Sequence, residues 1–132
     1  MFERNQDSRI VFIYGRTGSG KTELLEEILE KVLSYENEKI LIFDTKRVHL
    51  FGYSTKENVT FAYDNYLENL SLFRGKYIFI DEFFGIEEKG FKKKLIEKIE
   101  KEKMMAFITS QTKCFSTNDY RNIILVNLGN KY

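Results

Sequence analysis

The sequence predicts an α/β fold with a parallel sheet, built as a single domain of 132 residues. Short continuous runs of β-branched and aromatic residues recur along the chain, and such runs are typical of strands buried on both faces. Stretches with apolar residues at helical spacing separate several of these runs. Strands that alternate with helices through short connections form a parallel sheet covered by helices. We therefore expect a ligand at the carboxyl ends of the strands.

The first third of the chain predicts a strand, a turn, a helix and a second strand. The first strand is expected over Ile10–Tyr14, and the glycine-rich segment Gly15–Gly20 ends it. A second buried strand is expected over Lys39–Phe43. Between them lies an amphipathic helix, whose apolar residues recur at helical spacing opposite glutamates: Leu25, Ile28, Leu29, Val32 and Leu33.

The remainder of the chain continues the alternation. Gly52–Thr55 indicates a turn, because glycine and small polar residues favour one. The other expected elements are a short strand at Val59–Ala62, a short helix at Asn65–Phe73, a strong strand at Tyr77–Ile80, a helix at Glu87–Lys103, and strands at Met104–Ile108 and Asn122–Leu128.

Composition excludes several classes of protein. The chain has 21 Lys+Arg and 20 Asp+Glu, a formal net charge of +1, so bulk charge does not drive nucleic-acid binding. It has no apolar run long enough to span a membrane, and the first residues lack the pattern of a signal peptide. Cys114 is the single cysteine, which excludes an internal disulfide framework. We expect a cytoplasmic protein.

The strongest motif fits the pattern G-x-x-x-x-G-K-[ST], which binds nucleotide phosphates between a strand and a helix. Its glycines allow backbone torsions that let the loop amides converge on phosphate oxygens, and the helix N-terminus adds partial positive charge. The lysine is expected to reach the β- and γ-phosphates of ATP, and the threonine hydroxyl to bind Mg²⁺. The motif residues are Gly15, Arg16, Thr17, Gly18, Ser19, Gly20, Lys21 and Thr22.

Two acids end the strong strand at Tyr77–Ile80. Asp81 is expected to orient Mg²⁺, as in a Walker B motif. Glu82 is expected to polarise the attacking water as a general base. A carboxylate aimed at water favours ATP hydrolysis over phosphate transfer to a small molecule.

Polar residues Thr109, Ser110 and Gln111 follow the apolar run Met104–Ile108. If this strand lies beside the strand before the glycine-rich loop, Gln111 reaches the γ-phosphate or the attacking water. Gln111 is then a sensor of hydrolysis.

These motifs, in this order, resemble the ASCE division of P-loop ATPases, and within it the FtsK/HerA family of DNA-translocating and genome-packaging motors. Asp44-Thr45-Lys46 is similar to the D-x-K that ends that family's second strand. Asp81-Glu82-Phe83 resembles its Walker B segment, Ser110-Gln111-Thr112 its sensor, and Arg121–Leu125 its final core strand. The likeness spans roughly Ile10–Leu128.

The resemblance implies a three-layer P-loop NTPase with a mainly parallel five-stranded sheet in the order 5-1-4-3-2. It also implies a homo-oligomeric ring, hexameric in the family's manner, that hydrolyses ATP between subunits and moves DNA through its channel. Such a ring needs an arginine from a neighbouring subunit, for which Arg121 is the first candidate and Arg74 and Arg47 are others. We expect a viral or mobile-element protein, in the host cytoplasm if viral, with a viral or accessory protein as a further partner.

Two other functions remain open from the residues. The first alternative is a nucleotide-dependent switch or regulatory ATPase that moves no DNA. A small-molecule kinase is disfavoured, because the stretch 112–130 holds only Arg121 where such enzymes carry an arginine-rich lid. The lysine-rich tract Lys89–Lys103 favours a solvated helix face over a phosphate-contact surface. His49, the single histidine, is expected on a surface loop, and no His-based metal site is expected.

Overall fold

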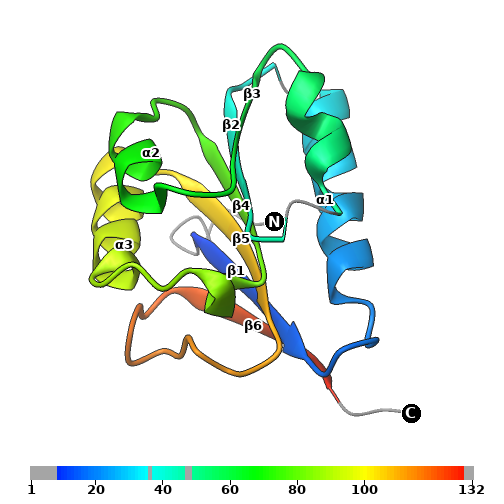
Figure 1. Cartoon of the computed structure of the whole chain (residues 1–132). Coiled ribbons are helices and arrows are strands. Elements are labelled where there is room, and N and C mark those ends of the chain that lie inside the picture. Colours follow the sequence, from blue (N-terminus) through cyan, green and yellow to red (C-terminus); the bar gives the residue numbers. More distant parts are fainter. Residues whose placement is uncertain (1–8, 36, 47–48, 130–132) are drawn as a thin grey trace.

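The computed structural model describes residues 9–35, 37–46 and 49–129. It shows a parallel sheet with helices on both faces, which confirms the predicted α/β fold class (Figure 1). In chain order the elements are β1 (Ile10–Gly15), α1 (Lys21–Tyr35), β2 (Ile40–Asp44), the 3₁₀ helix η2 (Phe51–Thr55), β3 (Val59–Ala62), α2 (Tyr66–Leu72), β4 (Tyr77–Asp81), the 3₁₀ helix η3 (Phe83–Gly85), α3 (Phe91–Glu102), β5 (Met105–Ser110) and β6 (Ile123–Gly129).

The sheet has six strands in the order β3-β2-β4-β5-β1-β6. The five strands counted from the sequence keep the expected order, and β3 is an additional strand beside β2, which corrects the expected number. Ile40 of β2 is in register with Val59 of β3 on one side and with Tyr77 of β4 on the other. Every residue of β2 is buried, because β2 lies between two strands and its side chains enter the core layers on both faces of the sheet.

The helices divide the core into two layers. On one face α1 and η2 cover the sheet, and Leu25, Leu29 and Tyr53 pack there against Phe79 and Phe107. On the other face α2 and α3 lie together, as Figure 1 shows. There Tyr66, Leu70, Phe91, Leu95 and Ile99 pack against the opposite side chains of the sheet. Within the described ranges, no helix has the length and apolarity needed to cross a membrane.

The helix expected at Glu87–Lys103 begins later, at Phe91. Gly90 has φ +83°, a left-handed conformation that ends the preceding loop and cannot continue a helix backward. Glu88 has another task in this loop. Its two carboxylate oxygens accept the backbone N–H groups of Tyr66 and Leu67, both at 2.8 Å, and so cap the first turn of α2.

The strand register brings four strand ends to one edge of the sheet. Asp44 is in register with Asp81, and Tyr14 with Ser110. The carboxyl ends of β1, β2, β4 and β5 therefore meet where the glycine-rich loop leaves β1, at the edge where a ligand is expected.

Candidate active site

The glycine-rich loop connects the end of β1 to the first turn of α1. Gly18 and Gly20 have φ +87° and +95°, and a Cβ at either would meet no other atom within 4 Å. The loop therefore bends in a way that favours glycine and leaves open space above its backbone. Ser19 Oγ is buried without a hydrogen-bond partner among the described residues. Open space, backbone amides and an unpartnered hydroxyl fit the phosphates of a nucleotide.

Lys21 begins α1 with its side chain folded back under the loop. It is 4% exposed, and its Nζ donates a hydrogen bond to the carbonyl oxygen of Arg16 at 3.1 Å. The same carbonyl accepts the N–H of Ser19 at 3.1 Å. The ammonium group is thus held at the centre of the loop, where it can meet the β- and γ-phosphates.

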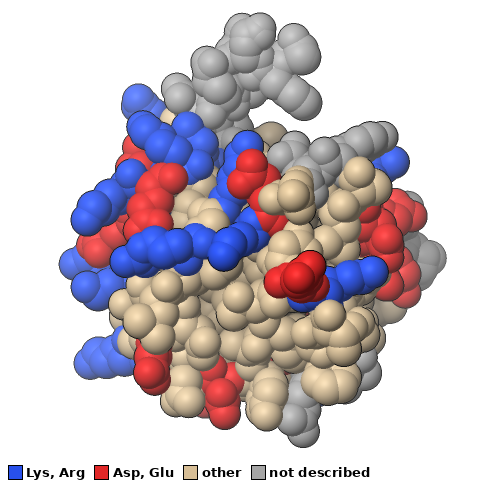
Figure 2. Space-filling model, turned by 90° about the horizontal axis from the view of Figure 1, so that it is seen from above, with Lys and Arg blue, Asp and Glu red and all other residues tan. Residues whose placement is uncertain are grey.

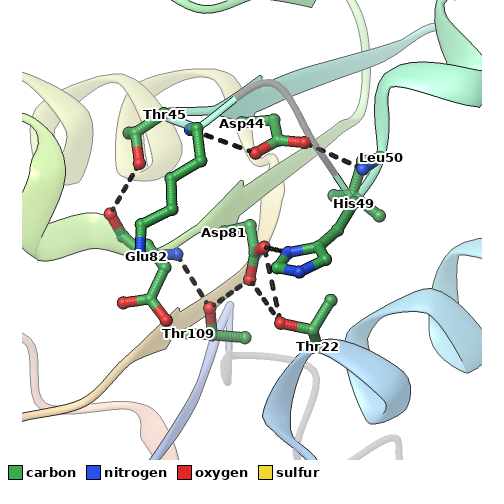
Figure 3. Close-up of polar contacts among 9 residues, drawn as sticks. Thr22, Asp44, Thr45, His49, Leu50, Asp81, Glu82 and Thr109 are labelled. Atoms are coloured by element: carbon green, nitrogen blue, oxygen red, sulfur yellow. Dashed lines mark hydrogen bonds and ion pairs between the residues drawn. The ribbon is translucent and has the colours of Figure 1, made fainter. Parts of the chain in front are cut away.

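Asp81, the last residue of β4, is the centre of a hydroxyl and imidazole network (Figure 3). It is 1% exposed. Thr109 Oγ1 donates to its Oδ1 at 2.7 Å, and Thr22 Oγ1 lies 3.3 and 3.5 Å from its two carboxylate oxygens. Nδ1 of His49 lies 3.2 Å from Oδ2. The carboxylate of Asp81 and the hydroxyl of Thr22 are hard oxygen ligands side by side, which suits Mg²⁺.

The backbone of Glu82 is fixed by two neighbouring strands. It adopts a left-handed conformation, φ 62° and ψ 64°, which is costly for a residue with a Cβ. Its N–H donates to Thr109 Oγ1 at 2.9 Å, and its carbonyl oxygen accepts a weak hydrogen bond from Thr45 Oγ1 at 3.5 Å. These contacts with β5 and with the end of β2 turn the chain sharply after Asp81. The Glu82 side chain then lines a cavity beside the glycine-rich loop.

Asp44 shapes the loop that follows β2. Its side chain is buried, and its carboxylate accepts the N–H of Leu50 at 2.8 Å and the N–H of Lys46 at 3.3 Å. These bonds draw both ends of the loop toward the sheet. The loop thereby carries Lys46 and His49 to the cavity. Arg47, one candidate for a trans-acting arginine, lies outside the described residues.

A cavity of about 320 Å³ lies between the glycine-rich loop, Glu82 and the loop after β2. It is lined by Thr17, Gly18, Gly20, Lys21, Thr22, Glu23, Glu26, Lys46, His49, Glu82 and Gln111. Most residues expected in the site therefore lie in one place, and Gln111 stands at its rim, exposed. Gly15 lies below the loop, where an added Cβ would come within 2.8 Å of Ser19 Oγ and of the backbone of Gly129. Arg16 is exposed beside the cavity.

Arg121 does not reach this cavity in its own chain. It lies just before β6, at the amino end of a strand that runs parallel to β1. The loop that binds phosphate leaves the opposite, carboxyl end of β1. Arg74, before β4, is likewise at the amino edge of the sheet.

Three residues of this network were not given their roles by sequence reasoning. His49 is 47% exposed on a loop, as expected, yet it contacts Asp81. Thr109 links Asp81 to the N–H of Glu82, whereas the expectation placed the important polar group at Gln111. Asp44 was recognised only as the end of a strand. The sequence signal was an acid directly after the apolar run Ile40–Phe43, and only the structure shows that this acid is buried.

The fold and the site define a P-loop nucleotide-binding domain: a buried strand, a phosphate loop, a helix, and an acidic strand end beside the loop threonine. Residues 7–123 match the AAA domain family. The chain therefore belongs to this family of P-loop ATPases, whose members generally use ATP and Mg²⁺.

Solved structures share the fold at low sequence identity. Domain III of the replication initiation protein DnaA from Thermotoga maritima is similar with a TM-score of 0.62 and 19% identity, over 95% of this chain and 56% of that chain. ATPases 2 and 3 of Thermomonospora curvata EccC, solved in complex with a signal sequence peptide, are also similar. Their TM-score is 0.61 at 14% identity, over 80% of this chain and 25% of that chain. Caenorhabditis elegans PCH-2 is similar with a TM-score of 0.53 and 14% identity, over 97% of this chain and 36% of that chain. The chain thus spans about a quarter to just over half of these proteins. No curated protein matches the chain.

Proposed function

We propose that the chain binds ATP with Mg²⁺, hydrolyses it, and uses the hydrolysis to translocate or package DNA as a subunit of a ring. The observation that carries the hydrolytic part is the placement of Glu82. Its backbone is fixed by Thr109, its side chain lines the phosphate cavity, and it stands directly beside the buried carboxylate of Asp81. A carboxylate in this position suits the activation of a water molecule.

Each side chain has a distinct part in the proposed reaction. Lys21 and the loop amides bind the β- and γ-phosphates, and Ser19 Oγ gains a partner there. Thr22 and Asp81 would hold Mg²⁺, which supplies positive charge to the phosphate oxygens. Glu82 orients the attacking water and accepts its proton. Gln111, at the rim, contacts the γ-phosphate or that water.

The proposed ring rests on the charge of the site and on the likeness to FtsK/HerA motors. No arginine of the described residues lines the cavity. An arginine supplied by another subunit accelerates phosphoryl transfer by about 10³–10⁵ in other systems. We propose Arg121 of a neighbouring subunit for this role, because it is exposed at the margin of the sheet. Arg74 is the second candidate.

One experiment tests the proposed function as a whole: the rate of ATP hydrolysis with and without DNA, together with the mass in solution in the presence of an ATP analogue. We expect hydrolysis, acceleration by DNA and an assembly larger than a monomer. Lys21→Ala is the control, since it removes the charge at the β/γ-phosphates and should abolish hydrolysis. A monomer that hydrolyses slowly and ignores DNA would contradict the motor and favour the nucleotide-dependent switch.

A further inference from the structure

The amino edge of the sheet, opposite the nucleotide cavity, carries a row of cations. Lys39 directly precedes β2, Lys76 directly precedes β4, Lys103 lies two residues before β5, and Arg9 directly precedes β1. These four strands are consecutive neighbours in the sheet. Four segments that are far apart in the sequence thus each place a positive side chain at the same edge. We call these four residues the amino-edge row.

Backbone hydrogen bonds hold the members of the row next to one another. The N–H of Lys76 donates to the carbonyl oxygen of Lys39 at 3.2 Å, and the carbonyl of Lys76 accepts the N–H of Met105 at 3.0 Å. The guanidinium of Arg9 reaches the carbonyl oxygen of Lys103 at 3.4 Å. Since neighbouring strands lie about 4.8 Å apart, the four positions span about 15 Å. The backbone positions of the row are therefore fixed and regularly spaced, and each of them carries a positive side chain.

The carboxylates around α3 do not neutralise this row. Glu102 forms an ion pair with Lys98 at 3.2 Å, and Glu100 accepts the hydroxyl hydrogen of Tyr120 at 2.8 Å. Lys39, Lys76 and Lys103 are exposed and form no ion pair with any described residue. Figure 2, seen from above, shows many Lys and Arg side chains on the side of the molecule where α3 lies, with Asp and Glu side chains between them.

Arg74 lies beside the row but is not counted in it, because it remains the second candidate for the trans-acting arginine. Its guanidinium donates to two backbone carbonyls, those of Ser71 and Phe73, each at 3.0 Å. Bonds to neutral carbonyls fix the side chain and leave its charge uncompensated. Glu38 is the carboxylate next to Lys39, and its side chain is half-buried. The amino edge therefore keeps a local excess of positive charge although the whole chain has a net charge of only +1.

We propose that the amino-edge row binds the phosphate backbone of DNA. Cations carried on a line of neighbouring strand ends are complementary to the line of phosphates along a nucleic-acid strand, and lysines serve as point charges toward phosphate. The exposed aromatic side chains Phe51, Tyr63 and Phe84 belong to other parts of the described chain. Contact with phosphates and without base stacking gives binding that does not depend on sequence.

This surface deepens the proposed function, on which it rests, by naming where DNA lies. The row and the phosphate loop occupy opposite ends of strands five or six residues long, which separates them by about 15–20 Å. DNA at the amino edge therefore leaves the nucleotide cavity open, and both ligands can be bound together.

The test uses two fluorescently labelled DNA probes, a single-stranded oligothymidine of about 20 nucleotides and a duplex of about 20 base pairs. Fluorescence anisotropy measures the binding of each probe between about 50 and 200 mM salt. The variant Lys39→Gln/Lys76→Gln/Lys103→Gln keeps the aliphatic stems and removes three charges. We expect its affinity to fall at least about tenfold, and the slope of log K against log salt to become shallower by about 2–3. The control Lys89→Gln/Lys93→Gln/Lys94→Gln makes the same charge change on exposed positions at the start of α3 and should bind like the parent.

ATP hydrolysis without DNA should be equal in the parent and both variants, which shows that all three are folded. Equal DNA binding by the parent and the row variant would overturn the inference and leave DNA as the proposed partner. Equal loss in both variants would also overturn it, because binding would then follow bulk charge. A parent that binds phosphatidylserine vesicles and neither probe would overturn both the row and the proposed DNA partner, while the ATPase proposal is judged by hydrolysis alone.

Discussion

Thr109 stabilises two consecutive residues of the site with a single hydroxyl group. Its Oγ1 donates to Asp81 and accepts from the N–H of Glu82. Thr109→Val keeps the shape but removes one donor to Asp81 and the acceptor of the Glu82 N–H, so we expect the free energy of unfolding to fall by about 1–3 kcal/mol. Because the carboxylates lose their positioning, kcat should fall by about 10–100-fold. Denaturant unfolding and steady-state kinetics measure both effects.

Thr109→Ser is the matched control, since it retains the hydroxyl and should recover most of the activity. A Thr109→Val protein with unchanged kcat would show that the hydroxyl does not position the carboxylates.

Glu82 is the residue on which hydrolysis depends most directly. Glu82→Gln keeps the size of the side chain and removes the group that accepts a proton. We expect kcat to fall by about 10²–10⁴-fold, while affinity for ATP stays close to that of the parent. Fluorescent-nucleotide binding and phosphate release measure the two quantities. An unchanged turnover number would assign the general base to another residue.

Tyr53 connects η2 to α1, because its hydroxyl group donates hydrogen bonds to two carboxylates of α1. Burial raises the pKa of its phenol above the usual range, and hydrogen bonds to the carboxylates of Glu30 and Glu26 raise it further. The unfolded chain releases this proton near pH 10, whereas the folded chain retains it. The contribution of Tyr53 to stability is therefore complete below about pH 10 and is lost as the pH rises above it.

We expect Tyr53→Phe to unfold more easily than the parent at pH 8, by about 1–3 kcal/mol, because two carboxylates lose a donor. The difference between the two proteins should narrow as the pH rises above about 10. Urea unfolding across this pH range provides the measurement. A constant difference at every pH would mean that the phenol titrates alike in both states.

Local sequence pattern located those parts of the site that lie in one contiguous motif. The loop from Gly15 to Thr22 and the pair Asp81 and Glu82 follow directly from strands that could be recognised. His49 could not be assigned in this way, because its contact with Asp81 exists only once the Asp44 carboxylate has folded the intervening loop. Among the polar residues after β5 the prediction chose Gln111, because the contacts of Thr109 with Asp81 and Glu82 exist only once β5 pairs with β4.

The turn between α2 and β4 packs closely against the start of β2 at Gly75. A Cβ at Gly75 would lie 2.8 Å from the backbone carbonyl of Lys39 and 2.4 Å from the ring of Phe73. Because the carbonyl belongs to the start of β2, it cannot move without disturbing the sheet. We expect Gly75→Ala to lower the free energy of unfolding by about 1–3 kcal/mol, measured in urea.

The control for that substitution is Gly52→Ala in η2, where an added Cβ would meet nothing within 4 Å. Equal stability of the two alanine variants would show that the α2–β4 turn adjusts freely.

At the level of elements, apolar runs and helical periodicity were sufficient for the fold class, whereas the order of five strands came from the resemblance to FtsK/HerA motors. They could not settle whether Val59–Ala62 joins the sheet, because four residues with mixed burial carry little pattern of their own. The start of α3 was also missed. Residues 87–89 are charged and were included in the predicted helix, but the left-handed Gly90 and the bond of Glu88 to α2 keep that stretch out of it.

The proposed ring makes a prediction for the whole molecule. Arg121→Ala removes the proposed trans-acting arginine and Lys21→Ala removes the phosphate-binding lysine, so each protein alone should be inactive. In a mixture, some interfaces combine an intact loop with an intact arginine, and we expect partial recovery of ATP hydrolysis. Titration of one variant into the other measures it. No recovery, with specific activity independent of protein concentration, would contradict a site shared between subunits.

The position of β1 between β5 and β6 has a consequence for protein synthesis. The ribosome makes β1 first among the strands and its two partners last, at about 5–20 residues per second. Until Met105–Gly129 have emerged, the nascent chain holds β1 as an apolar segment without either hydrogen-bonding neighbour. The phosphate loop is therefore translated early and assembled late, so ATP can stabilise this domain only after nearly all of it has left the ribosome.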